Sequence, residues 1–175
     1  MKISLAILLL TLASTPAMAA PSLPGGASSL SEAHGDWSVG CAVQGQGDAS
    51  KLACNVSQRQ LDKANQRQVL AIELTPAAGT ARGVLAMPLG MELDKGVVLQ
   101  VDAGKSTPAQ PYATCIAAGC IVPVNFDAAN LKLLRTGKTL NVLAAAANGK
   151  PIKLAVPLTG LPAALDRATA LLAGK

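Results

Sequence analysis

Aromatic side chains are scarce in this 175-residue chain, which contains one Trp, one Tyr and one Phe. Proteins that hold single-stranded nucleic acid usually stack the bases on aromatic rings beside clustered basic residues. The Lys and Arg residues here are spread along the sequence, although the formal net charge is +5. We therefore expect no nucleic-acid partner.

Histidine is almost absent, since His34 is the only one. General acid–base catalysis through histidine would depend on this residue alone. His34 has no obvious partner in the sequence, and we expect a solvated side chain. The spacing of the histidine and the cysteines matches no zinc-binding pattern.

Motifs for nucleophilic catalysis and phosphate binding are missing as well. The chain has no Gly-x-Ser-x-Gly elbow of a serine hydrolase. The triplet Gly104-Lys105-Ser106 ends like a phosphate-binding loop, but Leu99 stands where that loop needs a glycine. The sequence therefore predicts a protein that is not an enzyme and holds neither cofactor nor metal.

No apolar run reaches the roughly 20 residues that a membrane-spanning helix needs. The chain opens instead with Lys2, an apolar run over residues 5–12, and Ala17-Met18-Ala19, which together have the form of a secretory signal. We predict a signal peptide over residues 1–19 and a mature chain with no integral membrane span. Loss of Lys2 lowers the net charge from +5 to +4. The expected location is the periplasm, with secretion or association with the outer membrane left open.

The mature chain is long enough for one ordinary domain with a real core. Residues 21–31 are rich in Pro, Gly and Ser, so we predict a flexible lead-in over residues 20–34 and a single domain over residues 35–175. The oligomeric state stays open, because sequence alone does not distinguish an exposed edge strand from a covered one.

Four cysteines occur in the chain: Cys41, Cys54, Cys115 and Cys120. An even number in an exported domain favours two disulfides, and of three possible pairings the local ones, Cys41 with Cys54 and Cys115 with Cys120, are the simplest. A redox catalyst usually carries Cys-x-x-Cys at the start of a helix, whereas four residues separate the second pair and Gly119 suits a turn. We expect structural disulfides, and a working dithiol is the alternative.

Short β-like runs separated by turn residues fill the mature chain. They cover residues 36–43, 52–60, 67–74, 82–90, 96–104, 112–116, 120–124, 139–147 and 151–158. In the first run, Trp37, Val39 and Cys41 share one face, so we expect Trp37 in the core beside a disulfide. This pattern predicts a mainly β fold, an antiparallel β-sandwich with a barrel as the alternative.

A short amphipathic helix is predicted between residues 126 and 138. It would begin near Asn125 or Asp127 and end at Gly137. Its apolar side chains are Phe126, Leu131 and Leu134.

A second helix is predicted in the C-terminal tail, with Pro162 in its first position and an apolar face that includes Leu165 and Leu172. Asp166 and Arg167 interrupt the apolar run. We therefore expect this helix to dock on the domain rather than to enter a membrane.

Several motifs occur in a recognisable order. They comprise Trp37 and Cys41; Pro88, Leu89, Gly90 and Asp102; Tyr112, Cys115, Gly119 and Cys120; Leu131, Leu134 and Gly137; and Gly160, Ala164 and Leu165. From about residue 35 onward the chain resembles the invasion-associated locus B family of exported bacterial proteins. One departure is Leu161 after Gly160, where the family usually has Phe.

The resemblance implies an exported β-sandwich without a known catalytic centre, in a family named for members associated with host-cell invasion. We expect a binding protein with a possible role in virulence, whose partner is an unknown envelope or host protein. The candidate surface comprises Met87, Leu89, Met91, Glu92, Asp94 and Lys95. Burial of the three apolar side chains in the core is the alternative for this segment. The alternative function is a periplasmic redox or hydrolytic enzyme that uses Cys115 and Cys120.

Overall fold

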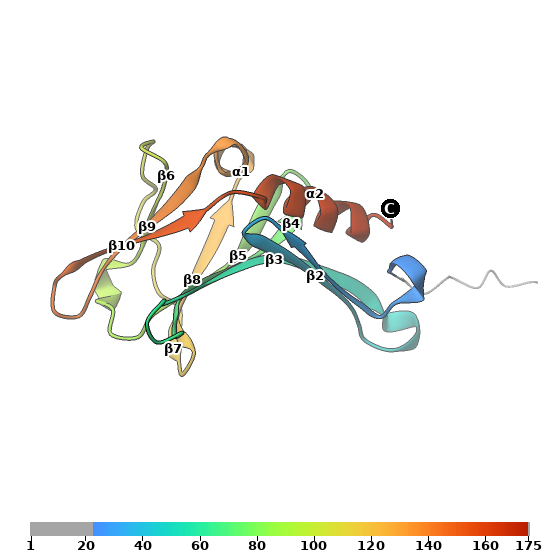
Figure 1. The fold of residues 1–175 in the computed structure, drawn as a ribbon, viewed down its shortest axis with the longest axis horizontal. Coiled ribbons are helices and arrows are strands. Elements are labelled where there is room, and N and C mark those ends of the chain that lie inside the picture. The colour runs from blue at the N-terminus through green and yellow to red at the C-terminus, as the bar shows by residue number, and fades with distance from the viewer. Residues whose placement is uncertain (1–22, 175) are drawn as a thin grey trace, which may run out of the picture.

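The structure is a computed structural model that describes residues 23–174. It consists of two antiparallel sheets, two α-helices and three short 3-10 helices (Figure 1). The 3-10 helices are η1 (Pro24–Gly26), η2 (Gly47–Ala49) and η3 (Leu93–Lys95). The predicted signal peptide and residues 20–22 of the lead-in lie outside the described residues.

The larger sheet has seven strands in the order β1-β2-β3-β4-β5-β8-β7, and all neighbours are antiparallel. In chain order these are β1 (Ser29–His34), β2 (Trp37–Gln44), β3 (Lys51–Leu61), β4 (Gln68–Ala77), β5 (Thr80–Met87), β7 (Thr114–Ile116) and β8 (Gly119–Phe126).

The second layer combines a small sheet with the helices. The small sheet has the order β10-β9-β6, formed by β6 (Val98–Val101), β9 (Thr139–Ala145) and β10 (Pro151–Pro157). Helix α1 (Ala128–Thr136) follows β8, and α2 (Leu161–Leu172) lies across β1 to β4 (Figure 1). The mainly β, antiparallel fold with two helices is thus confirmed, and the sheets do not close into a barrel.

The inner face of the larger sheet carries the core. Trp37, Val39 and Cys41 alternate with more exposed residues along β2 and are all buried, which confirms their predicted shared face. Because β2 and β3 pair in register, Cys54 and Val56 continue the same buried face.

Three polar side chains join the two sheets. Trp37 Nε1 and Gln58 Nε2 each donate to the carbonyl oxygen of Pro157 at 3.0 Å, and Gln60 Nε2 donates to that of Ala155 at 2.7 Å. These carbonyls belong to β10, one of the two edge strands of the small sheet. The side chains therefore cover an edge whose backbone acceptors would otherwise lack partners.

Both predicted helices are present. Asp127 caps α1, because its Oδ1 accepts a hydrogen bond from the backbone N–H of Asn130 at 2.8 Å. Helix α2 starts one residue earlier than predicted, so Pro162 is its second residue. Leu165 is buried as predicted, but Leu172 is 39% exposed. The prediction for Leu172 was wrong, because it is the last residue of α2 and no further turn covers it.

The prediction of a flexible lead-in is wrong for residues 29–34, which form β1 and pair along their whole length with β2. The inner face of β1 presents Leu30, Glu32 and His34. Two of these three residues are polar, so the segment lacks the apolar alternation that indicates a strand. The sheet therefore begins before residue 35.

Candidate functional site

The two disulfides follow the favoured pairing, and each joins residues directly opposite each other on neighbouring strands. Cys41 on β2 bonds to Cys54 on β3, and Cys115 on β7 bonds to Cys120 on β8. Their environments differ. Cys41 and Cys54 are each 4% exposed and Cys120 is 2% exposed, whereas Cys115 is exposed to solvent.

The predicted surface around the Pro-Leu-Gly turn separates into buried and exposed parts. Met87 and Met91 are buried in the core, whereas Leu89 between them is 60% exposed. Gly90 has a φ of 83°, the left-handed conformation that glycine adopts without a steric penalty. The turn therefore anchors two methionines inside and displays one leucine outside.

The charged part of this surface is tied to the small sheet. The Lys95 ammonium lies 3.0 Å from Glu92 Oε2, a contact that is an ion pair rather than an aligned hydrogen bond. The backbone N–H of Glu92 donates to the carbonyl oxygen of Ala145 at 2.9 Å. Asp94 lies exposed in the same turn, within η3. These contacts fix the backbone on which Leu89 is displayed.

The β7–β8 hairpin lies next to the end of β5. Met87 is paired with Cys120, and a Cβ on Gly119 would collide with the carbonyl oxygen of Met87, so only glycine fits at this position. Ile116 faces Gly119 across the hairpin and is 54% exposed.

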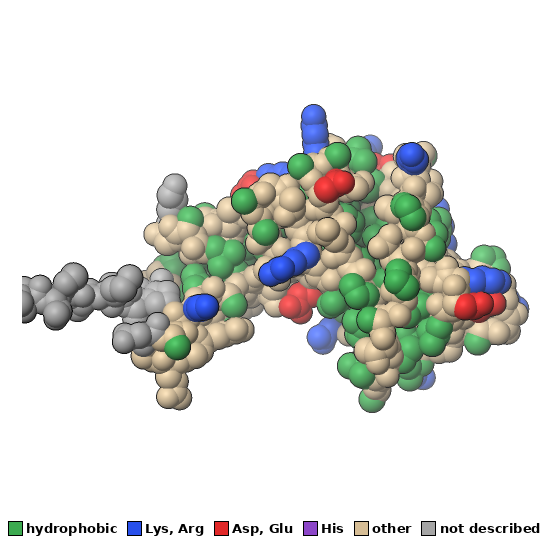
Figure 2. All heavy atoms as spheres, turned by 180° about the vertical axis from the view of Figure 1, so that it is seen from behind, with side chains coloured by type: hydrophobic (Ala, Val, Ile, Leu, Met, Phe, Trp, Pro, Cys, Tyr) green, Lys and Arg blue, Asp and Glu red, His purple; other side chains and the backbone are tan. Residues whose placement is uncertain are grey.

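Apolar side chains also occupy the outer face of β5, β8 and β7. We define the hairpin surface as this set together with the turn residue: Val84, Leu89, Ile116, Ile121 and Pro123. The register pairs Val84 with Pro123, and both are exposed. Figure 2 shows hydrophobic side chains gathered on the face of the molecule near this hairpin. On β2 and β3, by contrast, the outer face carries Ser38, Asn55 and Ser57.

Several of the other motif residues make hydrogen bonds or close contacts that hold neighbouring elements together. The carboxylate of Asp102 accepts hydrogen bonds from the backbone N–H groups of Lys138 and Thr139, and a Cβ on Gly137 would collide with Val101. A Cβ on Gly160 would likewise collide with the carbonyl oxygen of His34.

Tyr112 is partly buried against the core, and its hydroxyl is buried with no hydrogen-bond partner among residues 23–174. Burial raises its pKa. The hydroxyl is therefore held in its neutral form.

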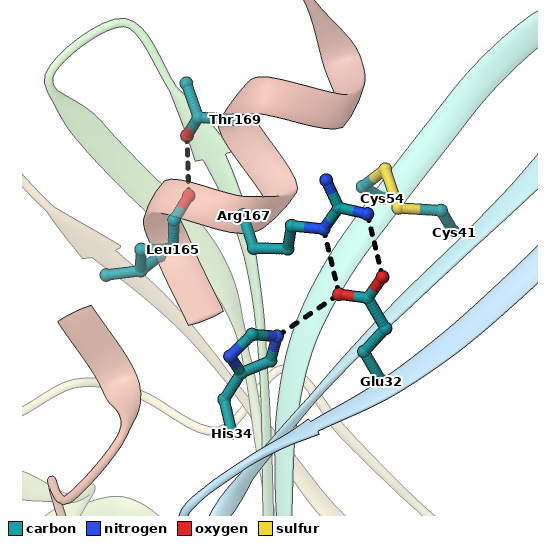
Figure 3. The surroundings of a disulfide bond; sticks show 7 residues. All are labelled: Glu32, His34, Cys41, Cys54, Leu165, Arg167 and Thr169. Carbon is teal, nitrogen blue, oxygen red and sulfur yellow. Dashed lines mark hydrogen bonds and ion pairs between the residues drawn. A yellow bond between two sulfur atoms is a disulfide. The ribbon is translucent and has the colours of Figure 1, made fainter. Parts of the chain in front are cut away.

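A polar cluster that the sequence did not reveal joins β1 to α2 (Figure 3). Arg167 donates through Nε and Nη2 to the two carboxylate oxygens of Glu32 at 2.9 and 2.8 Å. His34 Nε2 lies 3.3 Å from Glu32 Oε2 and the side chain is partly buried, so the expectation of a solvated His34 was wrong. The hydrogen bonds from Arg167 lower the pKa of Glu32 to about 2.

This cluster connects β1 to α2. The guanidinium neutralises the only carboxylate in the cluster, and no Ser, Thr or Cys side chain is hydrogen-bonded to His34 or Glu32 in the described part of the chain. Its one sequence signal is the alternation of Leu30, Glu32 and His34, which places both polar residues on the inner face.

Residues 23–174 include no group of three or more His, Cys, Asp or Glu side chains arranged to hold a metal ion. Neither do they include a helix that is long and apolar enough to cross a membrane.

The family model for invasion associated locus B proteins matches residues 37–169. The chain belongs to this family. An invasion protein B homolog of Brucella abortus (strain 2308) is 41% identical over 171 residues, covering 97% of this chain and 95% of the relative. Invasion protein B of Bartonella bacilliformis is 39% identical over 163 residues, with coverage of 89% and 85%.

A solved structure is also similar. The crystal structure of invasion associated protein B from Bartonella henselae superposes with a TM-score of 0.76 at 34% sequence identity. The match covers 83% of this chain and 98% of the solved chain. The fold described above is therefore the fold of the family.

Proposed function

We propose that this protein is an exported, non-catalytic binding protein of the bacterial envelope, and that the hairpin surface contacts its partner. The two disulfides favour an oxidising compartment, either the periplasm or the cell exterior. The partner is a protein of the envelope or of a host cell, in keeping with the invasion-protein names of the relatives.

The observation that carries the proposal is the exposure of aliphatic side chains on backbone that a disulfide and two buried methionines hold in place. Ile116 is held by a disulfide-linked hairpin, and Leu89 by a turn whose flanking methionines are buried. Clustered exposed aliphatic side chains commonly mark interaction sites. The Glu32 cluster does not compete with this interpretation, because all of its polar contacts are internal.

Site-specific photo-crosslinking tests the proposal. A benzophenone amino acid would replace Ile116 or Leu89 in the full-length protein, expressed with its own signal sequence in its own host. Leu133 on α1, which is similarly exposed, provides the matched control. We expect one discrete adduct from both hairpin positions and none from Leu133. Adducts of equal yield at all three positions, or no adduct with envelope or host-surface proteins, would refute the binding site.

Export is tested separately by sequencing the N-terminus of protein recovered from the periplasm and the medium. Cleavage after Ala19 would leave Ala20 as the first residue. Recovery of an intact N-terminus from the cytoplasm would contradict the proposed location.

A further inference from the structure

The two cysteines of the second disulfide differ in exposure to solvent. Cys115 lies exposed on β7, whereas Cys120 lies in the core and is 2% exposed. In the first disulfide both partners are buried, and α2 lies across their strands. A thiolate that attacks a disulfide must reach one sulfur directly. Cys115 is the only disulfide cysteine of the chain that is exposed.

The strand that carries Cys115 is held weakly by comparison with the rest of the sheet. β7 has three residues, all exposed, and within residues 23–174 β8 is its only strand neighbour. The Cα atoms of Cys115 and Cys120 are 3.9 Å apart. This short spacing is typical of a non-hydrogen-bonded pair of an antiparallel sheet, whose two residues exchange no backbone hydrogen bonds. The disulfide therefore supplies a large share of what holds β7 to β8.

We propose that the Cys115–Cys120 disulfide is a thiol-exchange site, at which Sγ of Cys115 is attacked by an external dithiol of the Cys-x-x-Cys class. This inference does not rest on the proposed binding function, although opening the bond would also release Ile116 of the hairpin surface. Attack forms a mixed disulfide between the dithiol and Cys115, and Cys120 leaves as a thiolate that takes up a proton. The second thiolate of the dithiol then attacks the dithiol sulfur that is bonded to Cys115, and Cys115 leaves as a thiolate that takes up a proton. The protein disulfide gains two electrons and two protons, and the external dithiol becomes a disulfide.

Exchange at this site has a local structural consequence. Once the bond opens, β7 is held to β8 only by a three-residue ladder and can detach. The backbone groups of Gly119 and Ile121 that face β7 then become an exposed sheet edge. Cys120 remains in the core as a thiol, an environment that free cysteine tolerates well. The rest of the sheet keeps the buried Cys41–Cys54 bond.

Timed reduction tests the site on the oxidised mature protein under native conditions. Dithiothreitol or thioredoxin serves as the dithiol, N-ethylmaleimide traps free thiols, and trypsin then separates the two disulfides. Residues 106–132 form one peptide that contains both Cys115 and Cys120. We expect this peptide to gain two alkyl groups at least roughly tenfold faster than Cys41 and Cys54 react. Equal rates, or reaction of Cys115 and Cys120 only in denaturant, would overturn the proposal.

Two single variants identify the attacked sulfur. Of this pair, Cys120→Ser leaves only the cysteine on the exposed strand β7 and Cys115→Ser only the cysteine in the core, while both lose the same bond. We expect Cys120→Ser to form a mixed disulfide with an activated aromatic disulfide, whose aromatic thiolate leaves, at least roughly tenfold faster than Cys115→Ser does. Equal trapping, or faster trapping by Cys115→Ser, would show that Cys115 is not the point of attack. Hydrogen exchange after reduction should rise in residues 114–121 and stay unchanged in β2 and β3, and unchanged exchange in 114–121 would refute the release of β7.

Discussion

The β2–β3 hairpin and the β7–β8 hairpin use the same bond in opposite settings. In each, a disulfide joins residues that face one another across antiparallel strands. The first connects long strands of 8 and 11 residues and lies under α2. The second ties a three-residue edge strand to β8 and leaves Cys115 in solvent.

The difference shows that a cross-strand disulfide can serve either a core or a surface. Around Cys41 the bond adds to a packed face that includes Trp37 and Val56, so the hairpin would have a buried face without it. Around Cys115 little packing exists, since all of β7 is exposed. The second bond therefore holds Ile116 in place at the edge rather than filling the interior.

The largest effect is expected on the β2–β3 side, for Trp37→Ala. Trp37 is 1% exposed and donates a hydrogen bond to Pro157 across the two sheets. We expect a loss of about 3 to 5 kcal/mol in the free energy of unfolding, measured by guanidinium titration. Trp37→Phe keeps an aromatic ring but removes the donor, and it should cost about 1 to 2 kcal/mol. A loss below about 1 kcal/mol for the alanine variant would show that this side is not the core of the fold.

Removing each disulfide in turn tests how far each hairpin depends on its bond. The separations are 13 and 5 residues, for which loop-closure entropy gives about 3 and 2 kcal/mol. We expect Cys41→Ala with Cys54→Ala to lower the free energy of unfolding by about 3 kcal/mol or more, because buried packing is lost as well. The Cys115→Ala and Cys120→Ala pair should cost at most about 2 kcal/mol, and a larger loss for it would invert our ranking of the two hairpins.

Local sequence rules predicted the parts of this molecule that depend on local chemistry. The disulfide partners, the cap at Asp127 and the buried face of β2 all follow from spacing and alternation. β1 was missed because Glu32 and His34 occupy inward positions, and Arg167, the partner of Glu32, is 135 residues away from it. Leu89 is exposed and Met91 is buried because only Met91 faces the second layer, and tertiary packing rather than local sequence determines which residue does so.

The attachment of α2 to β1 should be sensitive to acid. Because Arg167 lowers the pKa of Glu32 from 4.5 to about 2, the ionised carboxylate stabilises the folded state above pH 4.5. This contribution should disappear as the pH falls from about 4.5 to about 2. The free energy of unfolding of Glu32→Gln should be lower than that of the unaltered protein at pH 7, and the two should converge towards pH 2.

Asp166→Asn provides the control for this experiment, since it breaks the pair with Arg135, in which Asp166 is well exposed. Exposed pairs contribute about 0 to 1 kcal/mol, so this variant should change stability little. A gap between Glu32→Gln and the unaltered protein that stayed constant from pH 7 to pH 2 would contradict the assigned role of the carboxylate.

The smallest effect on stability is expected on the β7–β8 side, for Leu89→Ser and Ile116→Ser. Both side chains are exposed, so each change should alter the free energy of unfolding by less than about 0.5 kcal/mol. If the hairpin surface binds a partner, each variant should lose most of the adduct formed by the benzophenone at the other hairpin position, whereas Leu133→Ser should retain both adducts. Undiminished adduct in both variants would mean that the β7–β8 disulfide holds no binding surface. A large fall in stability would mean instead that these side chains belong to the core, and that the two hairpins differ less than their exposure indicates.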